Sequence, residues 1–299
     1  MGIAAQAFQS ADYQNCWPGA SGSVCAPCED LMIRALVRAS HFPPTVAVTT
    51  IATAYAASLG WRGVGLLQVL FTVLFSQLSV GWSNDAFDAP LDAQSGRKDK
   101  PTAVGAISPR ILWRAAVLAA AGSILLSWRL AGWLGCAIAV GATAVAWLYN
   151  LALSRTIWSW LPYAIAFGLI PTFLTYGIEH RAPEAWVIAV FSIFGVSAHL
   201  ANALPDLESD RSAGRSGICV KLGAKRTSFT CWSLLGIGSV ILALQTQHVT
   251  GLLPGIVGAG YLGAFAYGKR STRRQAAFQA LLAAFAIDAI VFAIAVRHR

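Results

Sequence analysis

The chain has 299 residues, of which 56% are hydrophobic and only 12% are charged, and its formal net charge is +9 at pH 7. Soluble globular domains carry charge on about a quarter of their residues. This composition therefore excludes an ordinary soluble domain and indicates a membrane protein.

Residues 1–33 contain no basic start followed by an apolar core, so we expect no cleaved signal peptide there. Cys25 and Cys28 form a CxxC pair, but no second pair or nearby histidine supplies the four ligands of a zinc site. We interpret residues 1–33 as a disordered cytosolic tail ahead of a membrane domain that covers residues 34–299.

Nine apolar stretches in the membrane domain approach the twenty residues or so that a helix needs to cross a bilayer. They are residues 43–60, 64–82, 111–127, 131–149, 158–177, 186–203, 227–246, 251–268 and 275–296. The alternation typical of barrel strands is missing, so these spans are predicted to be helices. The predicted fold class is all-α, a polytopic membrane protein of about nine transmembrane helices.

Most of the 22 Lys and Arg residues fall on the loops of one face when the nine spans are threaded through a bilayer. Cytoplasmic loops are enriched in basic residues. The pattern predicts a multi-pass protein of the cell membrane with its N-terminus inside and its C-terminus outside. Membrane lipids are therefore expected partners, whereas nucleic acid is not.

Two acidic segments on the predicted cytosolic face repeat one pattern, N-x3-D-x3-D-x3-G-R. The first is NDAFDAPLDAQSGR at residues 84–97, and the second is NALPDLESDRSAGR at residues 202–215. The first follows the second span and the second follows the sixth, so both segments face the same side. The repeat predicts an internally duplicated helical bundle around a central cavity.

Each copy of the pattern predicts a ladder of carboxylates, because residues four apart lie one above another on a helix. The ladders comprise Asp85, Asp88 and Asp92 in the first copy and Asp206 and Asp210 in the second. Pro90 and Pro205 predict a kink or a frayed helix end at each ladder. Clustered carboxylates stay ionised beside a divalent metal, and Mg²⁺ prefers one or two carboxylates together with water and phosphate oxygens. We expect these five aspartates to bind Mg²⁺ and to form the catalytic centre.

Basic side chains accompany the aspartates on the same face, namely Arg97, Lys100, Arg155 and Arg215. Arginine binds phosphate oxygens through paired hydrogen bonds, and lysine binds them as a point charge. A diphosphate held between the two ladders is therefore the expected ligand of these cations.

The motifs resemble those of the UbiA superfamily of intramembrane prenyltransferases. Residues 84–92 match its NDxxDxxxD motif, residues 206–210 match its DxxxD motif, and YNLALSR at residues 149–155 resembles its tyrosine and basic loop. The segments GRKDKP (96–101) and GICVKLG (217–223) resemble the stretches that follow the two motifs. The resemblance covers nearly all of residues 34–296.

The resemblance implies an Mg²⁺-dependent transferase that ionises an allylic prenyl diphosphate and releases pyrophosphate. The acceptor of the prenyl group would be a small aromatic or lipid-like molecule. The resemblance also implies that Asn84, Tyr149 and Asn202 contact substrate, together with the four cations. Asn202 stands where many members have lysine, and Ala203 replaces an acid, so the acceptor subfamily stays open.

Other interpretations remain open from the residues alone. A terpene cyclase on the same scaffold would ionise the same diphosphate, and a cation transporter could also place acids in duplicated halves. Transporter acids usually lie near the bilayer midplane, whereas these ladders begin where the apolar runs end. Tyr163, Phe167 and Tyr176 are candidate contacts for a prenyl chain. His199 is expected either to orient the acceptor, to act as a base, or to be a packing residue.

Overall fold

The structure, a computed structural model, describes residues 26–212, 214 and 216–247, and all of its regular elements in these ranges are helical. The helices are α2 (Ala26–Ala39), α3 (Phe42–Ser58), α4 (Gly63–Gln94), α5 (Pro109–Leu151), the 3-10 turn η1 (Leu153–Arg155), α6 (Leu161–Glu179), α7 (Ala185–Ala203), α8 (Leu207–Ser212) and α9 (Ile218–Thr246). The expected all-α polytopic class is confirmed.

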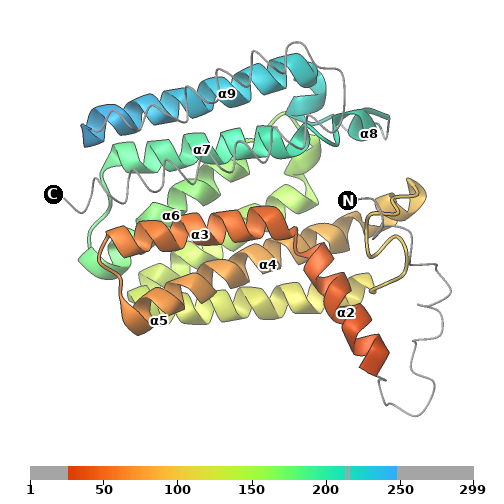
Figure 1. Cartoon of the computed structure of the whole chain (residues 1–299), viewed down its shortest axis with the longest axis horizontal. Helices are drawn as coiled ribbons and strands as arrows, with labels where there is room; N and C mark the ends of the chain where they lie inside the picture. The colour runs from red at the N-terminus through yellow and green to blue at the C-terminus, as the bar shows by residue number, and fades with distance from the viewer. Residues whose placement is uncertain (1–25, 213, 215, 248–299) are drawn as a thin grey trace.

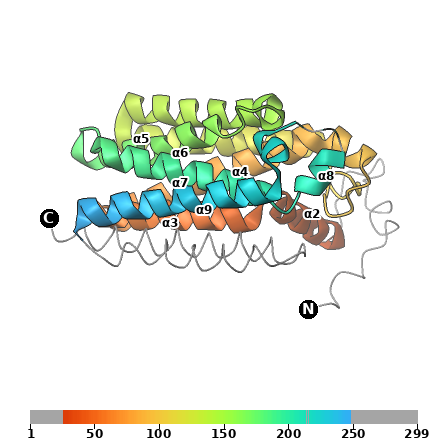
Figure 2. The same ribbon diagram turned by 90° about the horizontal axis from the view of Figure 1, so that it is seen from above.

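The long helices lie side by side with their axes nearly parallel, and the short α2 and α8 lie at one end of this bundle (Figures 1 and 2). The most extensive packing is between α4 and α5, followed by α6 on α7 and α7 on α9. The loop that follows α4 reaches the same end as α2 and α8. That end therefore gathers both acidic motifs and the loops beside them.

Every predicted span from 43–60 to 227–246 has a helical counterpart. Within the described residues, five helices are long and apolar enough to cross a membrane, namely α4, α5, α6, α7 and α9. The predicted spans at 251–268 and 275–296 lie outside the described residues. The start of α2 at Ala26 makes residues 26–33 of the predicted tail helical.

Helix α5 contains two predicted spans, 111–127 and 131–149, joined without a loop. The backbone leaves helical geometry only at Ala131 and Gly132, and Gly132 has a φ of 60°, which glycine tolerates because it has no Cβ. The rings of Trp113 and Trp147 lie 4.8 Å apart, whereas a straight helix would separate them by roughly 50 Å. The two halves of α5 therefore fold back on each other as a hairpin.

The two acidic motifs differ in backbone conformation. Helix α4 runs beyond the predicted span and continues through the first motif to Gln94 with Pro90 inside it, so the expected frayed end is absent there. Helix α7 ends at Ala203, and a turn containing Pro205 precedes α8. The proline prediction thus holds for the second motif, where α7 ends and the chain turns before α8.

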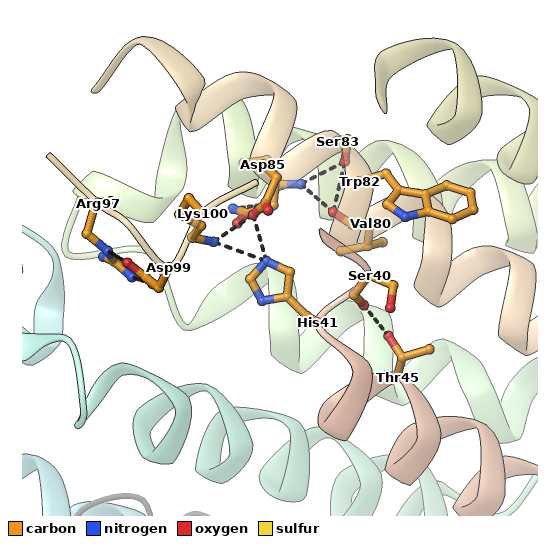
Figure 3. Close-up of polar contacts among 12 residues, drawn as sticks. Ser40, His41, Thr45, Val80, Trp82, Ser83, Asp85, Arg97, Asp99 and Lys100 are labelled. Carbon is orange, nitrogen blue, oxygen red and sulfur yellow. Dashed lines mark hydrogen bonds and ion pairs between the residues drawn. The ribbon is translucent and has the colours of Figure 1, made fainter. Parts of the chain in front are cut away.

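The junction between α2 and α3 presses directly on α4 near the first motif. A Cβ at Gly81 would lie 2.7 Å from the carbonyl oxygen of Ser40, so only glycine allows this approach. The same carbonyl accepts a hydrogen bond of 2.7 Å from the Thr45 hydroxyl (Figure 3). These contacts place His41, one of the two residues between the helices, beside the aspartate motif.

Candidate active site

A cavity of about 270 Å³ opens among the helices at the end that carries the motifs. Its wall includes charged side chains from both halves of the chain: Asp88, Asp92, Asp206 and Asp210, with Arg97, Lys100 and Arg155. Asn84, Tyr149 and Asn202 also line it. The structure therefore brings together the predicted site residues except Asp85 and Arg215, and Arg215 lies outside the described residues.

The first motif presents Asp88 and Asp92 from adjacent turns of α4. Asp88 Oδ1 accepts a hydrogen bond of 3.2 Å from Arg155 Nη2, which comes from η1. Asp92 is only 3% exposed, and its Oδ2 has no hydrogen-bond partner in the described part of the chain. A buried carboxylate oxygen without a partner is costly, so Asp92 is suited to a cation from outside the chain.

The second motif meets the first through Arg97. The Arg97 guanidinium donates to both oxygens of Asp99, at 2.9 and 2.7 Å, and its Nη2 lies 3.6 Å from Asp206 Oδ1. The hydrogen bonds from Arg97 hold the pKa of the Asp99 carboxyl below its ordinary value. Arg97 thus reaches from the loop after α4 to the aspartate that follows α7.

Asp85 lies behind the cavity wall, in a contact of its own. It is 1% exposed, and its Oδ1 lies 2.6 Å from Lys100 Nζ and 2.9 Å from His41 Nε2 (Figure 3). Lys100 and His41 line the cavity, whereas Asp85 does not. Its assignment as a metal ligand stays a prediction, and the observed contacts give it a second task, which is to hold Lys100 and His41 in place.

The side chain of Asn150 on α5 forms hydrogen bonds with α4 at the start of the first motif. Asn150 donates to the Val80 carbonyl at 3.2 Å and to the Ser83 hydroxyl at 2.9 Å, and its Oδ1 accepts from Asn84 Nδ2 at 3.2 Å. Asn150 is buried. These bonds fix the position of Asn84 on the cavity wall, because they leave its amide little freedom to turn.

Aromatic side chains form another part of the wall, from α5, α6 and α7. They are Tyr149, Tyr163, Phe167 and His199. The ring of His199 lies 4.7 Å from that of Tyr163 and 5.7 Å from that of Tyr149, edge-on in the second case. An apolar wall next to a charged wall suits a ligand with a charged head and a hydrocarbon body.

The donor set fits an ion that a phosphate ligand helps to hold. In the described ranges, no group of three or more His, Cys, Asp or Glu side chains is close enough to enclose a metal. Mg²⁺ takes one or two carboxylates and completes its octahedron with water and phosphate oxygens. The paired aspartates and the unpartnered Asp92 oxygen supply that kind of partial site.

Sequence reasoning missed three polar residues of the site, namely His41, Asn150 and Ser159. His41 directly precedes the Phe-Pro-Pro that opens α3, and this position at a helix start was the available signal. Asn150 was hidden inside the YNLALSR segment. Nothing in its own segment marks Ser159, whose partner His199 lies 40 residues away.

The fold and site define a helical membrane protein whose duplicated aspartate motifs and basic loops face one cavity. The chain belongs to the UbiA prenyltransferase family, whose model matches residues 43–288. It is accordingly a member of a prenyltransferase family and an integral, multi-pass membrane protein, as the resemblance indicated.

Individual relatives are distant. The chain is 24% identical to naringenin 8-dimethylallyltransferase 2, chloroplastic, of Sophora flavescens, over 81% of this chain and 63% of that protein. The chain thus spans less than two thirds of that relative. It is 27% identical to the 1,4-dihydroxy-2-naphthoate octaprenyltransferase of Mycobacterium tuberculosis, over 72% of this chain and 77% of that protein.

The fold is that of solved UbiA homologues. The Archaeoglobus fulgidus homologue bound to DMAPP and Mg²⁺ superimposes with a TM-score of 0.60, over 85% of this chain and 99% of that one, at 16% sequence identity.

Proposed function

We propose that this protein transfers a prenyl group from an allylic prenyl diphosphate to an aromatic or lipid-like acceptor, with Mg²⁺ as cofactor and pyrophosphate as the second product. The observation that carries the proposal is the shared cavity, in which two aspartate pairs and three cations stand beside an aromatic wall. Related proteins support it, since a UbiA homologue binds DMAPP and Mg²⁺.

Asp88, Asp92, Asp206 and Asp210 would hold Mg²⁺, which, when bound, neutralises negative charge on the leaving diphosphate. Arg97, Lys100 and Arg155 would bind the phosphate oxygens, and they stabilise the same developing charge. Each of these cations already lies beside a carboxylate, at 3.6 Å or less. Donor binding would therefore exchange one anionic partner of Arg97 and of Arg155 for another, while Asp85 keeps Lys100 in place.

The reaction forms one bond and breaks one. The bond between C1 of the prenyl group and the diphosphate oxygen breaks, and its electron pair leaves with pyrophosphate. A nucleophilic atom of the acceptor bonds to C1 and gives up its proton to water. The aromatic wall formed by Tyr149, Tyr163 and Phe167 keeps water from C1 until the acceptor reacts.

The deciding experiment uses purified protein in detergent with DMAPP or geranyl diphosphate, Mg²⁺ or EDTA, and acceptors such as naringenin and 1,4-dihydroxy-2-naphthoate. Pyrophosphate release and the masses of the organic products are measured. Mg²⁺-dependent formation of a prenylated acceptor supports the proposal. A cyclic hydrocarbon formed without any acceptor indicates a terpene cyclase, and the absence of pyrophosphate release overturns both.

We further propose that the motif end of the bundle faces the cytosol across the cell membrane, because the basic loops lie there. A single cysteine introduced at Lys98 in a chain without its native cysteines tests this. An impermeant maleimide should label it in inverted vesicles and not in intact cells. The opposite labelling would reverse the orientation.

A further inference from the structure

A buried polar pair lies within the aromatic wall of the cavity. His199 on α7 is 4% exposed, and Ser159, between η1 and α6, is 1% exposed. Their side chains share a hydrogen bond of 3.1 Å between Ser159 Oγ and His199 Nε2. Both residues line the cavity. A buried polar pair on a cavity wall is positioned to meet a polar atom of a ligand.

His199 has hydrogen-bonding capacity left over. Its only hydrogen bond in the described part of the chain is the one to Ser159, through Nε2. A neutral imidazole offers one donor and one acceptor nitrogen, so Nδ1 can still bind one further group. His199 lies three residues before Asn202 on α7, about one helical turn farther from the end that carries the second motif.

The rings around His199 form a surface suited to a flat molecule. Tyr163 stacks on Phe167 with ring centroids 6.3 Å apart, and Tyr149 meets the Tyr163 ring edge-on at 5.1 Å. Aromatic rings prefer such offset and edge-on contacts with one another. A planar acceptor can extend the same arrangement into the cavity.

The cavity offers no spare cation for a second anionic ligand within the described residues. Arg97 lies beside Asp99 and Asp206, Lys100 beside Asp85, and Arg155 beside Asp88. The proposed donor takes these cations for its diphosphate. A carboxylate buried beside neutral Ser159 and His199 would lack a countercharge, which is costly.

Resting on the proposed function, we infer that His199 and Ser159 form the acceptor subsite, and that the acceptor is an uncharged hydroxyaromatic molecule whose hydroxyl bonds to His199. The ring of the acceptor packs against Tyr149 and Tyr163. The acceptor subsite is thus separate from the donor subsite, and the aspartates and the basic loops form the donor subsite. Binding of the acceptor should therefore depend on His199, and binding of the donor should not.

The test uses two acceptors that differ by one carboxylate, 1,4-dihydroxynaphthalene and 1,4-dihydroxy-2-naphthoate. Equilibrium dialysis measures their binding to the detergent-solubilised protein, and product mass measures their prenylation. We expect the wild-type protein to bind the uncharged compound at least tenfold more tightly. Equal binding, or tighter binding of the carboxylate, overturns the inference.

The variants His199→Phe and Ser159→Ala test whether these two residues bind the acceptor. His199→Phe keeps a ring of similar size and removes the hydrogen bond, so the KM or Kd of the uncharged acceptor should rise about tenfold, the usual worth of one such bond. The KM of the prenyl diphosphate should change less than twofold. Ser159→Ala should give a smaller rise in the same direction. The matched control is His180→Phe, because His180 is exposed and does not line the cavity.

The possible failures are distinguishable. No pyrophosphate release with any donor contradicts the proposed function itself. Normal release with an acceptor KM that neither variant alters contradicts only this inference. Equal increases in the KM of donor and acceptor show a general packing role for His199 and overturn the assignment as well. Should His199→Phe fail to purify as a monodisperse protein, Ser159→Ala and the acceptor pair decide the matter.

Discussion

Lys100 donates to Asp85 across 2.6 Å, and this contact ties the loop after α4 to the helix that carries the first motif. His41 joins from the α2–α3 junction, 2.9 Å from the same oxygen. One buried carboxylate therefore organises three segments of the chain. It does so beside the cavity and not within its wall.

Asp85→Asn tests whether this carboxylate positions Lys100 or binds a metal. A positioning role predicts a higher KM for the prenyl diphosphate, about tenfold, with little change in the Mg²⁺ concentration for half-maximal rate, because Lys100 loses its charged anchor. Thermal unfolding should also shift downward, since one partner of a buried pair loses its charge. A raised Mg²⁺ requirement with an unchanged donor KM would instead assign Asp85 to the metal.

Asp88→Ala and Asp206→Ala should abolish turnover while the protein still inserts and purifies. Each change removes a carboxylate from the cavity wall and leaves the helix packing in place. The milder Asp92→Asn should raise the Mg²⁺ concentration needed for half-maximal rate, because the amide is a weaker ligand for a hard cation. Pyrophosphate release across a Mg²⁺ titration measures both effects. Near-wild-type rates in either alanine variant would count heavily against the site.

Arg97→Ala should weaken use of the prenyl diphosphate by about ten- to a hundredfold, the equivalent of roughly 1.5–3 kcal/mol for a charge-assisted contact. Arg97→Lys should restore only part of the loss, because an ammonium lacks the planar fork that Arg97 shows toward Asp99. Lys98→Ala removes a neighbouring exposed charge and serves as the control. Kinetics at limiting donor decide the outcome, and an unchanged rate for Arg97→Ala would sink the assignment.

Gly81→Ala should destabilise the protein and lower its activity, because the new methyl group would meet the Ser40 carbonyl oxygen at 2.7 Å and push the α2–α3 junction away. His41 moves with that junction. Gly141→Ala is the matched control, since nothing lies within 4 Å of a Cβ there. Thermal unfolding in detergent should show a lower Tm for Gly81→Ala alone. Equal Tm values for the two variants would mean that the α2–α3 junction can shift without loss of stability.

The sequence predicted those parts of the site that periodicity controls. A spacing of four residues predicted that Asp88 would align with Asp92, and the repeated pattern predicted that Asp206 and Asp210 would face them. All four aspartates line the same cavity in the structure. Spacing also put Asp85 on that face. Its actual surroundings depend on His41, which is 44 residues away in the sequence, and no local pattern reports a contact of that kind.

The helix ends were also predicted in part, where a local residue determines them, and missed in part. Gly132 allowed the chain to reverse between two apolar stretches, and the break between the predicted spans 111–127 and 131–149 fell close to it. Pro90 predicted a kink or a frayed end, and α4 continues past it as a helix to Gln94, so the frayed end is absent. Proline inside a helix removes one backbone hydrogen bond, and the surroundings that offset this loss do not show in a single sequence.

Two ion pairs join segments far apart in the sequence, Arg155 with Asp88 and Arg97 with Asp206. These pairs balance part of the charge of the carboxylates that line the cavity. In the proposed reaction, a donor that arrived with its metal ions would replace one set of neutralised charges by another. Departure of pyrophosphate would then restore the two pairs. Asp88 and Asp206 would thus face a cation at every stage of the proposed cycle, an arginine before and after it and a metal ion during it.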